Sequence, residues 1–64
     1  MPFVSIKMLE GKSKEQKRSL IKSVSKSVAE SLNIDVKNVW VAVEDIPKDE
    51  WGLGGELASE MLKH

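Results

Sequence analysis

The chain has 64 residues, contains no cysteine, and carries ten basic and ten acidic side chains, so its formal net charge is zero. This composition excludes disulfides and thiolate chemistry, and it gives no global field that would attract nucleic acid or an anionic membrane. Because so short a chain buries only about 60% of its unfolded surface, its own core is marginal. We expect a single domain, residues 1–64, stabilised by association with copies of itself.

No apolar run approaches the ~20 residues that a membrane span requires. The first residues alternate in polarity and do not resemble a signal peptide, so cytoplasmic residence is expected. The only histidine, His64, ends the sequence, where a frayed terminus is expected, and no residues have metal-ligand spacing. We predict that the protein uses no metal and no cofactor.

The segment "FVSIKML" at residues 3–9 alternates with period two, which predicts a strand. Pro2 stands in front of it, and proline is well suited to the first position of a strand. One face of this strand is expected to pack against the core. Its residues are Val4, Ile6 and Met8, while Phe3, Ser5 and Lys7 face the other way.

A long helix is predicted next, over residues 14–32. Ser13 and Gln16 form the capping box that typically opens a helix, because each side chain satisfies a free backbone N–H. The helix is expected to stop near Asn33. Its apolar stripe consists of Leu20, Ile21, Val24, Val28 and Leu32.

The β-branched run "VWVAV", residues 39–43, predicts the second strand, and Pro47 is expected to end regular pairing. The segment "KDEWGLGGE", residues 48–56, reads as a turn and short hairpin. Its "GLGG" lacks the following Lys-Ser/Thr of a phosphate loop, so the glycines are best explained by turn geometry. The final "LASEMLKH" is compatible with either a short helix or a packed tail.

Strand, long helix and strand form a βαβ unit, so the two strands are expected to be parallel with a right-handed crossover. The fold class is therefore α/β (α+β in some schemes), with a parallel two-stranded sheet and a short C-terminal hairpin. The helix can cover only one face of the sheet, which leaves Phe3 and Trp40 uncovered on the other. Parallel sheets are normally covered on both faces, so this pattern predicts an oligomer whose sheets face inward.

A basic stripe runs along the outer face of the predicted helix, and it consists of Lys14, Arg18, Lys22 and Lys26. Such a stripe can mark a nucleic-acid footprint, but it is more often the solvated side of an amphipathic helix. Because the net charge is zero and no aromatic residue lies among these cations, we expect no nucleic-acid partner.

Two residues stand out as candidates for chemistry. Removal of Met1 would turn the Pro2 nitrogen into a secondary amine, a base whose pKa an apolar site or a neighbouring cation can lower from the ~7.7–8.0 of an α-amino group. A strand-starting proline without further role remains the alternative. Lys12 precedes the unpaired N–H groups of the predicted helix, where it suits a carboxylate site. A solvated loop lysine explains it equally well.

Taken together, "MPFVSIKMLEGKSKEQKRSLI" and "WGLGGELAS" resemble the 4-oxalocrotonate tautomerase family of very small isomerases, over nearly the whole chain. The resemblance implies a tautomerase (MIF-like) fold whose β-α-β subunits pair into dimers and usually build a hexamer, a trimer of dimers. It also implies enol–keto 1,3- or 1,5-proton transfer on an unsaturated 2-hydroxy or 2-oxo acid. The amino-terminal proline, here Pro2, is then the general base.

The resemblance also implies a substrate-binding pocket. Trp51 matches an aromatic wall residue that is usually Phe or Tyr, and Leu9 and Leu53 match apolar wall positions. Lys12 stands where the family has an arginine that binds a carboxylate, and lysine lacks its planar two-point grip. Trp40 stands where the family has a second arginine, which reaches in from a neighbouring subunit. A tryptophan at this position offers one N–H and no charge.

These departures predict low or altered efficiency, on a monoacid or an apolar enol such as an aryl-substituted one. Two alternatives keep the same scaffold. Pro2 can act as an acid in hydration or dehalogenation of an unsaturated acid, which requires a carboxylate to activate water. The chain can also be a non-catalytic oligomer that lost an arginine.

Overall fold

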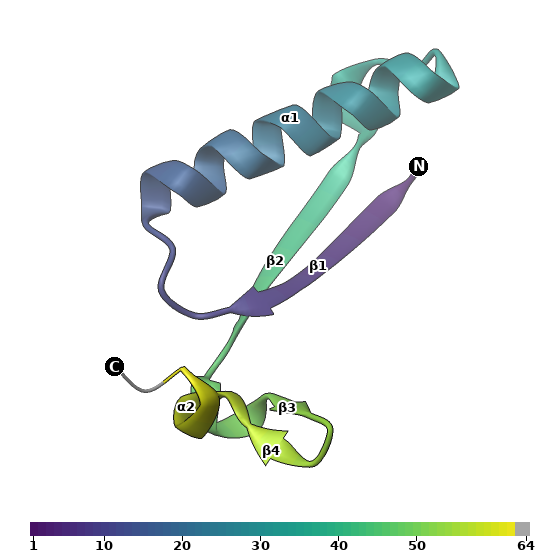
Figure 1. The fold of residues 1–64 in the computed structure, drawn as a ribbon. Coiled ribbons are helices and arrows are strands. Elements are labelled where there is room, and N and C mark those ends of the chain that lie inside the picture. Colours follow the sequence, from purple (N-terminus) through teal and green to yellow (C-terminus); the bar gives the residue numbers. More distant parts are fainter. Residues whose placement is uncertain (63–64) are drawn as a thin grey trace.

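The computed structural model describes residues 1–62 (Figure 1), so the expectation for His64 lies outside the described residues. Strand β1 (Phe3–Leu9) leads to helix α1 (Lys14–Leu32), and the short 3-10 turn η1 (Val36–Asn38) leads to strand β2 (Trp40–Ile46). A second 3-10 turn, η2 (Lys48–Glu50), is followed by the hairpin strands β3 (Gly52–Leu53) and β4 (Glu56–Leu57) and by helix α2 (Ala58–Met61). None of the helices within residues 1–62 has the length and apolarity of a membrane span.

Strands β1 and β2 pair in parallel, with Phe3 opposite Trp40 and Leu9 opposite Ile46, which confirms the predicted βαβ unit. The second strand was expected at residues 39–43 but is observed at Trp40–Ile46. It extends past the β-branched run because β1 supplies ladder partners as far as Leu9, and ladder bonds do not require apolar side chains. It stops before Pro47, as predicted.

The predicted bounds of helix α1 are confirmed, and both ends have a local cause. Ser13 and Gln16 form the capping box: the Ser13 hydroxyl accepts from the Gln16 N–H at 3.1 Å, and the Gln16 side chain accepts from the Ser13 N–H at 2.9 Å. At the other end, Asn33 adopts a left-handed conformation with φ 54° and ψ 51°. Asparagine tolerates this conformation better than most residues, so it ends the helix here.

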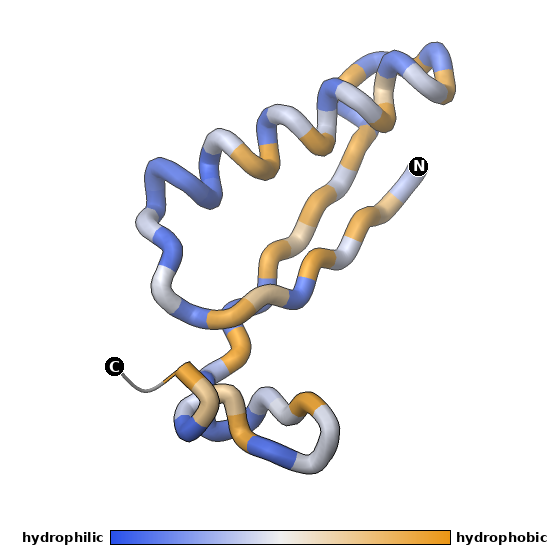
Figure 2. Tube along the Cα trace, viewed as in Figure 1, coloured by the Kyte–Doolittle hydropathy of each residue, from blue (hydrophilic) through white to orange (hydrophobic). Residues whose placement is uncertain are grey.

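The βαβ unit has only two layers, and Figure 2 shows the apolar side of α1 turned toward the sheet. The expected covered face is confirmed, since Val4, Ile6, Val41 and Val43 are half-buried. On the opposite face Phe3 is 65% exposed and Trp40 is 58% exposed. The helix stripe differs at its end: Leu32 is exposed, and Ala29 is the buried residue of that last turn.

A single chain lacks a substantial core. Among the described residues, Ala29 and Ala58 are the buried hydrophobic side chains. The radius of gyration is 14.9 Å, whereas a compact domain of this length has about 10.7 Å. The accessible surface is 5167 Å² for 7.1 kDa, against about 4,100 Å² for a compact monomer of that mass. The isolated chain therefore exposes apolar surface that a compact protein would cover.

The C-terminal segment forms a separate small layer below the end of the sheet (Figure 1). The predicted hairpin is confirmed, with Gly54 at φ 62° and Gly55 at φ 87° in its turn. Two successive positive φ angles are typical of the tight turns that match strand twist, and glycine adopts them without strain. Helix α2 settles the alternative left open for the last residues in favour of a short helix.

Candidate functional site

Pro2 lies half-buried at the start of β1, and its backbone is held by the neighbouring strand. The Trp40 N–H donates to the Pro2 carbonyl at 3.0 Å. In the described chain Met1 precedes Pro2, so the ring nitrogen belongs to a peptide bond and cannot act as a base. The Trp40 indole N–H donates to Met1 Sδ, which brings the indole to the amino terminus. Trp40 and Pro2, both predicted site residues, thus lie at the same end of the sheet.

A cavity of about 390 Å³ opens beside Pro2, lined by Met1, Pro2, Leu32, Ile34 and Asn38. Asn38 supplies an uncharged amide to this lining, and sequence reasoning did not single it out. No pattern in the polar connection between helix and second strand distinguishes Asn38 from its neighbours. Leu32, the last residue of α1, is exposed and lines this cavity.

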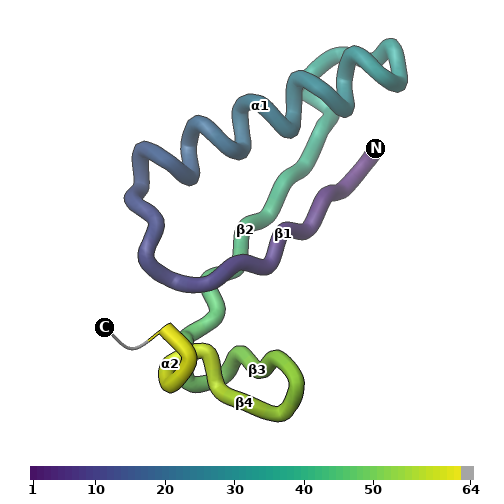
Figure 3. Tube along the Cα trace, in the orientation of Figure 1, coloured from purple at the N-terminus to yellow at the C-terminus, as the bar shows by residue number. Residues whose placement is uncertain are grey.

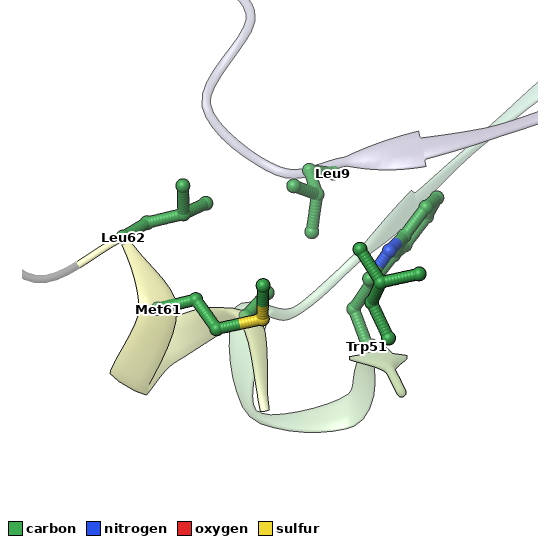
Figure 4. A pocket seen from close by; sticks show the side chains of 6 residues that line it. Leu9, Trp51, Met61 and Leu62 are labelled. Carbon is green, nitrogen blue, oxygen red and sulfur yellow. The ribbon is translucent and has the colours of Figure 1, made fainter. Parts of the chain in front are cut away.

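A second cavity, of about 150 Å³, lies at the opposite end of the sheet (Figure 4). It contains three predicted site residues, Leu9 from the end of β1, Trp51 and Leu53. The hairpin is held against α2 by the Ala58 N–H, which donates to the Trp51 carbonyl at 2.8 Å. The remaining lining residues are Ala58, Met61 and Leu62. Their helical spacing in "LASEML" was the signal that would have identified them, once a helix was preferred over a tail.

Lys12 lies exposed in the loop between β1 and α1, directly after Gly11, whose φ is 123°. It follows the end of β1 by three residues, and so stands at the same end of the sheet as the Leu9–Trp51 cavity, but it is not part of that lining. Within residues 1–62 no group of three histidine, cysteine or acidic side chains is placed to hold a metal ion. Lys12 is therefore an exposed cation next to this cavity and not a member of its lining.

The basic stripe of the helix is partly neutralised. Arg18 forms an ion pair with Glu15 on the same helix, and neighbouring Lys17 pairs with Asp45 at the end of β2. These pairs support the interpretation of this face as the solvated side of the helix.

The predicted site residues thus fall into two groups at opposite ends of the β1–β2 sheet; Figure 3 shows that the start of β1 and the C-terminal hairpin lie at these opposite ends. Pro2 and Trp40 lie at the amino-terminal end of the sheet, and Leu9, Lys12, Trp51 and Leu53 lie at the other. From Pro2 to Leu9 the extended strand spans about 23 Å at ~3.3 Å per residue. A small substrate cannot touch both groups within a single chain.

Comparison with known proteins gives matches along the whole chain. The family model described as tautomerase enzyme matches residues 2–61. A 2-hydroxymuconate tautomerase of Comamonas testosteroni is 43% identical over 61 residues, which are 95% of this chain and 97% of that protein. A solved 4-oxalocrotonate tautomerase isozyme of Methylibium petroleiphilum is 38% identical with a TM-score of 0.89, covering 98% of this chain and 100% of that one.

A second solved structure, a heterohexamer 4-oxalocrotonate tautomerase of Chloroflexus aurantiacus, is 31% identical with a TM-score of 0.90, covering 95% of this chain and 98% of that one. Sequence and backbone therefore agree with the same family over nearly the whole chain, and the family model begins at Pro2. The β-α-β architecture with its parallel pair and C-terminal hairpin is the architecture that these structures share. The chain belongs to the tautomerase family, and it is an isomerase.

Proposed function

We propose that the protein ketonises an unsaturated 2-hydroxy acid, with Pro2 as the general base. The observation that carries this proposal is the family match that begins at Pro2, the residue whose carbonyl is hydrogen-bonded to Trp40 at the open end of the sheet. Removal of Met1 frees the ring nitrogen as a secondary amine. That amine takes the proton of the 2-hydroxyl and returns it to a distant carbon, giving the conjugated ketone.

Lys12 is proposed to bind a substrate carboxylate, and Trp51, Leu9 and Leu53 to form the apolar wall. Trp40 contributes an aromatic face and one N–H beside Pro2. Among residues 1–62 no lysine or arginine side chain lines the cavity beside Pro2, so we expect a monoacid or aryl-substituted enol to be a better substrate than a dicarboxylate. Loss of one charge-assisted contact to a developing oxyanion costs on the order of 10²–10³ in rate.

A complete site requires a second copy of the chain, because the two groups of site residues lie at opposite ends of one sheet. The exposed Phe3 and Trp40 give each copy an apolar sheet face to pair with another. The large radius of gyration and accessible surface of the isolated chain favour the same conclusion. We therefore propose a homo-oligomer, a hexamer built as a trimer of dimers. The heterohexameric relative supports six subunits as the assembly size.

Hydration or dehalogenation receives no comparable support. Such a reaction requires a carboxylate that activates water near the proline. Among residues 1–62, no acidic side chain lines the cavity beside Pro2. Proton transfer by the Pro2 amine requires no such carboxylate, so it is the reaction we propose.

The proposal is tested by ketonisation of phenylenolpyruvate and 2-hydroxymuconate by the methionine-free chain and its Pro2→Ala variant. Replacement of the secondary ring amine by the primary α-amine of alanine is expected to lower kcat/KM by about 10²–10⁴ on both substrates. Ser19→Ala, an exposed change on α1, is the matched control and should leave both rates unchanged. Equal rates for Pro2→Ala and the parent chain would remove Pro2 from the mechanism.

A further inference from the structure

Glu10 links two segments that separate beyond the sheet. Its N–H donates to the Ile46 carbonyl at 3.0 Å, which continues the β1–β2 ladder by one residue. From this point one segment runs through Gly11 to Lys12, and the other runs through Pro47 into η2 and the hairpin. Glu10 is therefore the last residue at which these two segments are in backbone contact.

The Glu10 side chain makes a second connection. Its Oε2 accepts a hydrogen bond from the Lys48 N–H at 3.1 Å, between residues 38 positions apart in the sequence. The turn η2 has no local cap, because its N-cap residue is Pro47 and no side chain of its own caps it. By contrast, Ser13 caps α1 and Asp35 caps η1 from within the adjoining sequence. Glu10 supplies the missing acceptor from the other strand.

The position of this contact relates it to the site. Glu10 precedes Lys12 by two residues, and Lys48 precedes Trp51 by three. Gly11, between Glu10 and Lys12, has φ 123°, a backbone conformation that residues other than glycine rarely adopt. The loop that carries Lys12 is thus held at Ser13 by the capping box and at Glu10 by paired contacts to the other segment. Within residues 1–62, removal of the Glu10 carboxylate would leave the ladder bond to Ile46 and the apolar cavity shared by Leu9 and Trp51 to join the loop to the hairpin segment.

We propose that Glu10 is a positioning residue for the tautomerase reaction: its carboxylate locks the Lys12 loop to the segment that carries Trp51. This inference rests on the proposed function of Lys12 as carboxylate anchor. The lock fixes the distance between the cation that binds one end of the substrate and the apolar wall that receives its body. It acts through Lys12 and Trp51 and needs no contact with the reacting atoms.

The lock itself is tested by amide hydrogen exchange of the assembled, methionine-free protein, measured by NMR. In Glu10→Ala the Lys48 amide is expected to lose about tenfold in protection, the effect of one hydrogen bond. The Trp40 amide, which donates to Pro2 at the other end of the sheet, should keep its protection. Glu10→Gln retains a carbonyl oxygen at the same reach and should restore most of the Lys48 protection. Glu30→Gln, an exposed acid on α1, controls for the loss of one charge.

The kinetic arm follows ketonisation of phenylenolpyruvate by the same variants. Because Lys12 is proposed to bind the substrate, Glu10→Ala should lower kcat/KM about tenfold, mainly through a higher KM. The pH profile, set by Pro2, should keep its shape, and Glu10→Gln should recover most of the loss. If Glu10→Ala leaves the Lys48 protection or the KM unchanged, the lock is refuted. It is also refuted if Glu10→Ala lowers the protection of the Lys48 and Trp40 amides together and Glu10→Gln does not restore it. An inactive parent chain with a protected Lys48 amide would instead refute the proposed function.

Discussion

Replacement of Phe3 by alanine is expected to weaken the assembly, because Phe3 is 65% exposed on the uncovered face of the sheet. A phenylalanine has an accessible surface of roughly 200 Å², so the exposed part of Phe3 leaves about 130 Å² for another copy to cover. At ~25 cal/mol per Å² this burial stabilises the interface by about 3 kcal/mol per copy. A two-fold interface contains the residue twice, so the two copies together contribute about 6 kcal/mol to the free energy of association. Phe3→Ala removes most of this contribution, and the dissociation constant should rise on the order of 10³-fold or more.

The assay is sedimentation velocity or native mass spectrometry over a dilution series, with ketonisation measured on the same samples. The parent chain should remain assembled where Phe3→Ala dissociates, and its activity should fall in parallel, because a single chain separates Pro2 from the Leu9–Trp51 cavity. Val36→Ala, at an exposed apolar residue on η1 and outside strands β1 and β2, is the control. A parent chain that is a stable monomer, or an active monomeric Phe3→Ala, would refute the reasoning.

Other substitutions test separate parts of the account. Lys12→Ala should raise KM for both enol acids, whereas Lys12→Arg should lower KM for 2-hydroxymuconate through a two-point contact with a carboxylate. If steady-state kinetics show the same KM in Lys12→Ala as in the parent chain, Lys12 does not bind the substrate carboxylate. Trp40→Phe removes one neutral N–H and should lower kcat/KM about two- to tenfold on phenylenolpyruvate. Ser13→Ala removes the helix cap and should lower the free energy of unfolding by about 1 kcal/mol in urea titration; no change would place the cap's contribution elsewhere.

Much of the fold was predictable because its signals are local. Alternation in residues 3–9 and the apolar stripe of the helix each require only the spacing of neighbouring side chains. The capping box at Ser13 fixes the first turn of α1 within three residues. The end of β2 was missed because "EDI" carries no apolar alternation, and its pairing depends on β1 far away in the sequence.

The arrangement of the site was less accessible from the sequence. The resemblance identified Pro2, Trp40 and Trp51 individually. The structure adds that Trp40 shares an end of the sheet with Pro2, through their hydrogen bond, and that Trp51 lies with Leu9 at the other end. The contact between Glu10 and Lys48 had no signal, because it joins distant residues and a carboxylate after a strand is usually solvated. Long-range pairing of this kind depends on the packed geometry and not on local pattern.

The central claim is that the free nitrogen of Pro2 performs the proton transfer. It is tested most directly by preparing the protein with methionine removal inhibited to different extents and determining by intact mass the fraction of chains that lack Met1. The account predicts that the ketonisation rate rises in proportion to that fraction and vanishes as it approaches zero. A rate independent of the presence of Met1 would contradict it.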